Sequence, residues 1–183
     1  MIAYKAFNKG LNCRGYQFQM GLNVTEKAQT KNCGFHCAEN PLDCLDYYHY
    51  MDHAEFYIVN AGGDVDEDDI DSKISCTELT IIQQLSKEEF VLHTLAYMVD
   101  HAKRECNRRV ERDKGTADYN GCVIVRGADP IASGKKGDIL AFARESEDGS
   151  IAEVAMVTVD GSTIKAGKWY GMELTERQVP ADG

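Results

Sequence analysis

Two long segments with the composition of β-strands constrain the fold of this chain more than any other feature. Residues 54–63 (AEFYIVNAGG) and residues 73–85 (KISCTELTIIQQL) are rich in β-branched and aromatic residues, and turn-forming residues bound them. The acidic segment 64–71 (DVDEDDID) lies between them. We therefore expect two strands, with the acidic segment as a connection at one edge of a sheet.

The acidic segment places six carboxylates among eight residues: Asp64, Asp66, Glu67, Asp68, Asp69 and Asp71. Three interpretations are open: a calcium loop, a solvated turn that keeps a sheet edge from pairing, and a surface that competes for a partner that normally holds nucleic acid. The calcium loop is disfavoured, because an EF-hand needs glycine at its sixth position and glutamate at its twelfth. This chain has Asp69 and Ser75 there.

A long helix is predicted over residues 86–112. Ser86 and Glu89 have the spacing of a capping box at its start. Apolar residues then follow at helical spacing, namely Val91, Leu95, Met98, Ala102 and Cys106. One long amphipathic helix beside a mainly antiparallel sheet predicts a protein of the α+β class.

The end of this predicted helix is basic. Residues 103–114 hold six bases and three acids, a local charge of +3 in a chain whose formal net charge is −10. The candidate contact residues are Lys103, Arg104, Arg108, Arg109 and Arg112. Two explanations are open: a favourable interaction with the helix dipole, and a patch that contacts a partner protein or phosphate groups.

Shorter elements are predicted near the N-terminus. Residues 2–7 and residues 15–21 have the pattern of two strands. Asn40 can cap a short helix over residues 41–50, because proline at the first helical position removes only an N–H that has no helical partner.

The chain from about residue 116 is predicted to be β-rich. Three successive segments between residues 121 and 142 have a period of eight residues and place Val123, Ile131 and Ile139 in register. This pattern indicates short β-solenoid-like rungs.

A β-meander is predicted after these repeats, because Asp-Gly pairs at 148–149 and 160–161 separate alternating runs. The chain thus divides into an α+β region at 1–115 and a β-rich region at 116–183. These are two domains or two parts of one continuous domain.

Composition restricts the classes of function. The chain has 183 residues, of which 43% are hydrophobic, as in globular proteins. Its net charge of −10 argues against general nucleic-acid binding, because phosphates would be repelled on average. No apolar run approaches the roughly 20 residues that span a bilayer, and the N-terminus lacks the pattern of a signal peptide. We therefore expect a cytoplasmic protein with no membrane contact.

Seven cysteines, an odd number without an export signal, indicate reduced thiols. A zinc site at Cys33, His36 and Cys37 is the less favoured interpretation, because adjacent ligands such as His36 and Cys37 make tetrahedral closure awkward. We expect no metal and no cofactor.

No nucleotide-binding, hydrolase or metalloprotease motif occurs in the sequence. Residues 34–48 (GFHCAENPLDCLDYY) resemble a piece of small ADP-ribosyltransferases, in which a glycine-aromatic strand leads through a turn into a helix ending in paired tyrosines. Residues 13–16 (CRGY) resemble a nucleotide-side element of the same enzymes. These short pieces do not place a catalytic glutamate, for which Glu153 is a candidate.

Four segments taken together resemble a wider family: MIAYKAFNKGLNCRGYQF, CGFHCAENPLDCLDYY, the acidic loop ending in DSKISCTEL, and VDGSTIKAGKWYGMEL. This family consists of mostly uncharacterised proteins of bacteriophages and prophages, and the similarity extends over most of the chain. Within it, the sequence resembles type II-A anti-CRISPR proteins, which are phage-encoded inhibitors of Cas9. The resemblance transfers no functional residue.

The anti-CRISPR resemblance implies a non-enzymatic protein of the bacterial host cytoplasm. Such a protein would bind Cas9 or the Cas9–guide RNA complex and block DNA targeting or cleavage, with local nucleic-acid contact. The acidic segment would then face basic Cas9 surface in place of phosphates. An ADP-ribosyltransferase-like enzyme and a phage accessory protein without a catalytic site are the alternatives.

Overall fold

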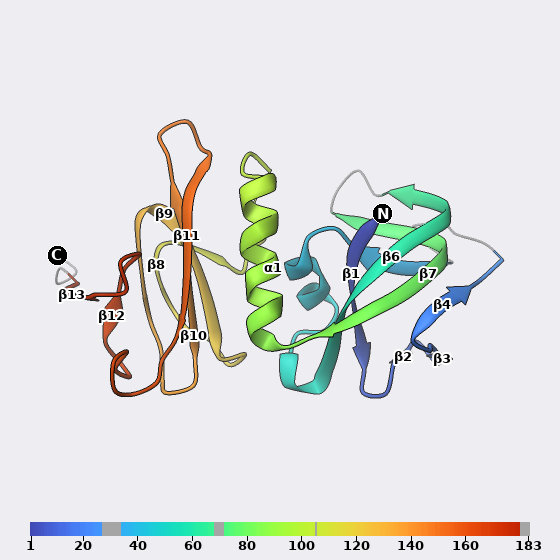
Figure 1. The fold of residues 1–183 in the computed structure, drawn as a ribbon, viewed down its shortest axis with the longest axis horizontal. Coiled ribbons are helices and arrows are strands. Elements are labelled where there is room, and N and C mark those ends of the chain that lie inside the picture. The colour runs from blue at the N-terminus through green and yellow to red at the C-terminus, as the bar shows by residue number, and fades with distance from the viewer. Residues whose placement is uncertain (27–33, 68–71, 105, 180–183) are drawn as a thin grey trace. The chain divides into compact units, whose positions relative to one another are not determined.

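The computed structural model describes residues 1–26, 34–67, 72–104 and 106–179. The chain forms two compact units, Met1–Phe90 and Val91–Gly183, and β-strands dominate both (Figure 1). The units divide within the helix α1 (Lys87–Asp100), whereas the sequence analysis divided the chain after residue 115.

The described part of the first unit consists of strands, two short 3-10 helices and the first residues of α1. In chain order the strands and 3-10 helices are β1 (Ile2–Asn8), β2 (Asn12–Cys13), β3 (Tyr16–Gln17), β4 (Gly21–Val24), β5 (Phe35–Ala38), η1 (Pro41–Asp46), η2 (Met51–His53), β6 (Ala54–Glu67) and β7 (Lys73–Leu85). The predicted strands at 2–7, 54–63 and 73–85 are confirmed, and β6 is longer than expected because it continues into the acidic segment.

Four of these strands form a closed ring. β1 pairs with β6, β6 with β7, β7 with β5, and β5 with β1, all antiparallel. Strand alternation directs every second side chain into this ring, and a core including Ala3, Phe7, Phe35, Tyr57 and Val59 fills it. Lys5 lies between Ala3 and Phe7 on the same face of β1, so a lysine occupies an inward position.

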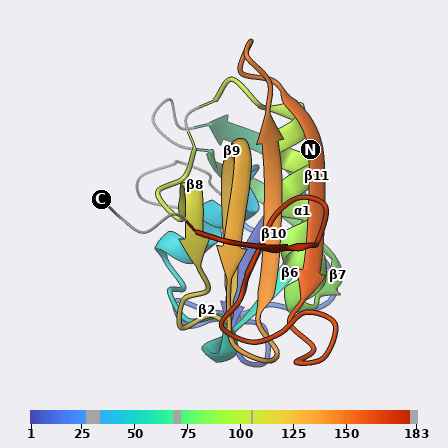
Figure 2. The same ribbon diagram turned by 90° about the vertical axis from the view of Figure 1, so that its left-hand side faces the viewer.

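The second unit is a sheet built around the strand β9. Its described strands are β8 (Val110–Thr116), β9 (Cys122–Ser133), β10 (Ile139–Glu145), β11 (Ile151–Thr158), β12 (Trp169–Tyr170) and β13 (Glu176–Arg177). β8 and β10 both pair with β9 in parallel, and β11 pairs antiparallel with β10. Figure 2 shows β8, β9, β10 and β11 side by side. The predicted turn at Asp148-Gly149 joins β10 to β11.

The predicted helix over residues 86–112 is wrong in its second half. The capping box is present, since Ser86 N–H donates to Glu89 Oε2 at 2.7 Å and Glu89 N–H donates to Ser86 Oγ at 3.1 Å. However, α1 ends at Asp100, and β8 begins at Val110. Among the described residues from 106 to 114 only Val110 is buried, so this segment has no apolar helical face and pairs with β9 instead.

Three shorter predictions are corrected. The helix expected over 41–50 is the 3-10 helix η1, which begins at Pro41 as predicted and ends at Asp46. The short repeated rungs expected between residues 121 and 142 are not seen, because β9 runs continuously through two of the three segments. The β-meander predicted to continue past Asp160-Gly161 does not do so at once, because residues 162–166 form no strand. The α+β class holds only in the coarse sense of a mainly β protein with little helix.

Candidate functional site

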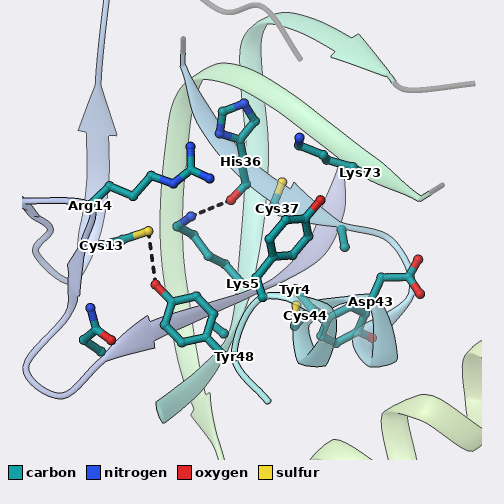
Figure 3. Close-up of a pocket in the computed structure, with 14 residues that line it drawn as sticks. Tyr4, Lys5, Cys13, Arg14, His36, Cys37, Asp43, Cys44, Tyr48 and Lys73 are labelled. Atoms are coloured by element: carbon teal, nitrogen blue, oxygen red, sulfur yellow. Dashed lines mark hydrogen bonds between the residues drawn. The ribbon is translucent and has the colours of Figure 1, made fainter. Parts of the chain in front are cut away.

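A pocket opens in the first unit where β1 and β5 diverge. β1 pairs with β6 along its whole length, but it pairs with β5 only at Tyr4 and Ala38. A cavity of about 440 Å³ lies at this seam (Figure 3). We call it the seam pocket; its main lining residues are Tyr4, Lys5, Cys13, Arg14, His36, Cys37, Asp43, Cys44, Tyr47, Tyr48 and Lys73. They come from β1, β2, the turn after β2, β5, η1, the segment after η1, and β7.

A tight hairpin turn carries Arg14 to the pocket. Cys13 pairs with Tyr16, and both residues between them have positive φ, 50° for Arg14 and 79° for Gly15. Positive φ at both central residues is the geometry of a type I′ turn. Glycine adopts it freely, but arginine pays about 1–2 kcal/mol. In Figure 3 the Arg14 side chain extends toward the side of the pocket that holds Lys5 and His36.

The opposite wall is fixed by a polar network around Asp43. Asn40 caps η1, because its Oδ1 accepts a hydrogen bond from Leu42 N–H at 3.1 Å. Ser72 Oγ donates to Asp43 Oδ2 at 2.6 Å, and Asn40 Nδ2 donates to Asp43 Oδ1 at 3.2 Å. The carboxylate of Asp43 therefore ties η1 to the start of β7.

Lys5 places a buried ammonium group at the pocket. The residue is only 6% exposed, and its Nζ donates to the carbonyl oxygen of His36 at 2.5 Å. The rings of Phe7 and Phe18 lie 5.2 and 5.4 Å from Nζ. Among the described residues no carboxylate forms an ion pair with Lys5. Buried ammonium groups are normally paired with an acid, so this arrangement is unusual.

Several thiols and phenols of the pocket have pKa values raised above their ordinary values. Burial raises the pKa of Cys44 to about 12. Burial also raises the pKa of Tyr4, and burial together with the hydrogen bond to Cys13 raises that of Tyr48. The Tyr48 hydroxyl donates to Cys13 Sγ at 3.2 Å. By residue type, the formally charged residues that line the pocket are Lys5, Arg14 and Lys73 against Asp43, a local excess of basic residues in an acidic chain.

The structure describes only part of the acidic segment. Asp64 and Asp66 are exposed residues of β6, and the backbone N–H of Asp64 donates to Thr77 Oγ1 at 2.8 Å. Glu67 is the last residue of β6. Asp68, Asp69 and Asp71 lie outside the described residues. The first half of the segment is therefore strand, where the sequence analysis expected a connection.

The five basic candidates do not share one helical face. Lys103 and Arg104 follow α1, Arg108 and Arg109 precede β8, and Arg112 belongs to β8. Three of them make contacts within the second unit: Arg104 donates to the Tyr97 hydroxyl at 2.8 Å, Arg109 to the Tyr119 hydroxyl at 3.5 Å, and Arg112 pairs with Glu145 at 2.8 Å.

The remaining candidates do not converge either. Glu153 lies on β11 of the second unit, where it pairs with Arg144 at 3.2 Å, so it is not a residue of the seam pocket. Cys33 of the zinc interpretation lies outside the described residues, and in the described part of the chain no three His, Cys, Asp or Glu residues gather as metal ligands. The six described cysteines form no disulfide.

Sequence reasoning missed Lys5. The signal was present in IAYKAF, because strict alternation puts Lys5 on the same face as Ala3 and Phe7. A lysine at an inward strand position is a candidate for a functional role, since lysine is almost never fully buried unless it is paired.

The seam pocket lies within the part of the chain that matches a known family. Residues 1–93 match a family described as a domain of unknown function, DUF7666. This chain belongs to the DUF7666 family. The match covers all the described elements that line the seam pocket. No curated protein matches the chain. No solved structure matches it. In the described residues no helix is both long and apolar enough to span a membrane.

Proposed function

We propose that the DUF7666 unit of this chain is a binding module whose seam pocket takes a nucleotide-type ligand, with a flat ring and a negatively charged group. The observation that carries this proposal is that two distant segments of the sequence meet at one pocket. CRGY and GFHCAENPLDCLDYY, the two pieces that resemble ADP-ribosyltransferases, are separate in sequence, yet both line the same pocket.

The size and lining of the pocket suit such a ligand. Its volume of about 440 Å³ falls in the range of roughly 300–1,000 Å³ that is usual for small-molecule sites. Tyr47 presents an exposed ring at the pocket, with Lys73 Nζ 5.7 Å from the ring centroid. An aromatic ring beside a cation can stack on a base and attract a phosphate.

The same arrangement favours binding over group transfer. ADP-ribosyl transfer develops positive charge on the ribose, which a free carboxylate would stabilise. Asp43 is the only described carboxylate that lines the pocket, and Ser72 and Asn40 hold both of its oxygens. We therefore propose a non-enzymatic role, with ADP-ribosyltransferase activity as the alternative.

Calorimetric titration with ADP-ribose tests this proposal. Removal of a stacking ring with Tyr47→Ala should weaken binding about tenfold. Tyr50→Ala is the matched control, because Tyr50 is equally exposed (56% against 55% for Tyr47) and does not line the pocket. Absence of binding to the wild-type protein, or equal effects of the two variants, would contradict the proposal. Transfer of label from labelled NAD to a protein would instead favour the enzymatic alternative.

Inhibition of Cas9 is a second proposal. The observation that favours it is the exposure of Asp64 and Asp66 on β6, where they can meet a basic surface. DNA cleavage by Cas9, titrated with the purified protein, is the test. Replacement of Asp64 and Asp66 by Asn should weaken inhibition, and inhibition should fall as salt rises. Glu147→Gln, at an exposed residue of the second unit, is the control.

A further inference from the structure

We infer that the buried ammonium group of Lys5 binds the phosphate oxygens of the ligand, which supplies the negative partner that the described residues do not give this lysine. The inference rests on the proposed function in that it needs a ligand in the seam pocket. It adds that the protein recognises the phosphate group of the ligand and that Lys5 is the residue that binds it.

The hydrogen bonds of Lys5 leave capacity for a ligand. An ammonium group has three N–H donors, and the described protein acceptor of Lys5 is one carbonyl oxygen, that of His36. Lys5 itself lines the pocket, so its remaining donors are accessible to a ligand there. Phe7 and Phe18 stabilise the charge through their ring faces but accept no conventional hydrogen bond.

A second cation supports phosphate over other anions. Arg14 lines the same pocket, and its guanidinium group can contact two oxygens of a phosphate at once. The turn that presents it holds Arg14 in a left-handed conformation, with φ of 50°. Unfavourable backbone conformations of this kind cluster at functional sites.

A purely structural role is the competing explanation for Lys5. The carbonyl of His36 lies on β5 beside the seam, and Lys5 satisfies it. If this were the whole role of Lys5, Lys5→Met would leave that carbonyl without its partner and would change stability, but it would not change the response to any anion. The two explanations therefore differ in ligand binding.

The experiment compares three probes by calorimetry: inorganic pyrophosphate, which has charge without a ring; adenosine, which has a ring without charge; and ADP-ribose, which has both. Each is titrated into the wild-type protein, Lys5→Met and the control Lys9→Met. Lys9 is an exposed residue that directly follows β1, and it does not line the seam pocket. We expect Lys5→Met to weaken pyrophosphate and ADP-ribose roughly tenfold or more, and to leave adenosine unchanged. Lys9→Met should leave all three unchanged.

The outcomes separate this inference from the proposed function. If adenosine and ADP-ribose bind with equal affinity, and Lys5→Met changes neither affinity, the inference is overturned and the nucleotide proposal stands. A second outcome is that pyrophosphate binds as tightly as ADP-ribose, that adenosine does not bind, and that Lys5→Met loses the binding of pyrophosphate. This outcome would support the inference and overturn the nucleotide proposal. If Lys5→Met does not fold, Lys5→Gln replaces it, since it has an N–H donor for the His36 carbonyl but no charge; unchanged pyrophosphate binding in that variant would then overturn the inference.

Discussion

In the described part of the chain each unit has one buried cationic side chain, and the two differ in the groups that surround them. Arg126 of the second unit is 5% exposed, and its guanidinium donates to Glu145 at 2.7 Å, to Ala102 O at 2.8 Å and to Gly149 O at 3.1 Å. Lys5 of the first unit is 6% exposed, but its ammonium group donates to one carbonyl oxygen and contacts two aromatic rings. Lys5 also lines the seam pocket.

A buried cation with a structural role has its partners within the protein, whereas a buried cation that binds a ligand lacks some of them. The protein itself provides a carboxylate and two carbonyls for Arg126, so this cation links β9 to the residues after α1 and to the β10–β11 turn. For Lys5 no described residue provides a carboxylate, and a cavity lies beside the ammonium group, where a carboxylate partner would be expected. A buried charge beside an empty space is a candidate for ligand recognition.

Removal of Arg126 should have the largest effect on stability. Arg126→Ala leaves the Glu145 carboxylate, whose side chain is only 18% exposed, without its main partner, and should lower the free energy of unfolding of the second unit by about 3–5 kcal/mol. Urea unfolding followed by the fluorescence of Trp169, the only tryptophan in the chain, measures this. A loss no larger than that of the control Arg144→Ala would show that Arg126 is not a structural centre.

Neutralising Glu145 should have the next largest effect, and it should depend on pH. The hydrogen bond from Arg126 lowers the pKa of Glu145 below its ordinary value of 4.5, and Arg112 lowers it further. The stabilisation is therefore complete at neutral pH and is lost as the pH falls from 4.5 through the folded-state pKa. Glu145→Gln should cost about 2 kcal/mol at neutral pH.

The same Trp169 unfolding experiment, repeated below pH 4.5, gives the control. The difference between wild type and Glu145→Gln should shrink as the pH falls. Other carboxyl groups of this unit with lowered pKa values, such as Asp148 and Asp160, are unchanged in the variant. A difference that stays constant with pH would mean that the charge of Glu145 contributes nothing.

Lys5→Met should change the free energy of unfolding much less than Arg126→Ala. The substitution loses one hydrogen bond and two ring contacts, but it also removes an ammonium group buried without an acid, so we expect a net change below about 1 kcal/mol. Hydrogen exchange of β1 and β5, measured by mass spectrometry, reports on the seam directly. If Lys5→Met lowers the hydrogen-exchange protection of β1 and β5 as much as global unfolding would, Lys5 is a structural cation like Arg126.

The smallest effect is expected for Glu153→Gln on the surface of the second unit. Glu153 pairs with Arg144, and its side chain is 60% exposed, so its removal should change the free energy of unfolding by at most about 0.5 kcal/mol. Binding of ADP-ribose should also be unchanged. Weaker binding of ADP-ribose by this variant would make Glu153 a candidate functional residue again.

Local signals in the sequence predicted the local parts of the fold. The strand segments at 2–7, 54–63 and 73–85, the capping box at Ser86 and the cap at Asn40 are all found in the structure. The helix end was not predictable in this way. Val110–Thr116 is a strand because it pairs with β9, and strand pairing depends on a distant partner that periodicity does not report.

Most residues of the seam pocket belong to segments with recognisable local patterns, namely CRGY, GFHCAENPLDCLDYY and the alternating IAYKAF with its inward lysine. Their meeting at one pocket is a property of the tertiary fold, which local patterns do not report. β1 and β5 are joined by a single residue pair, so the ring of strands opens beside Lys5, and the hairpin with Arg14 and the segment after η1 line that opening. Strand pairing sets this geometry, because it brings residues together that no sequence pattern connects.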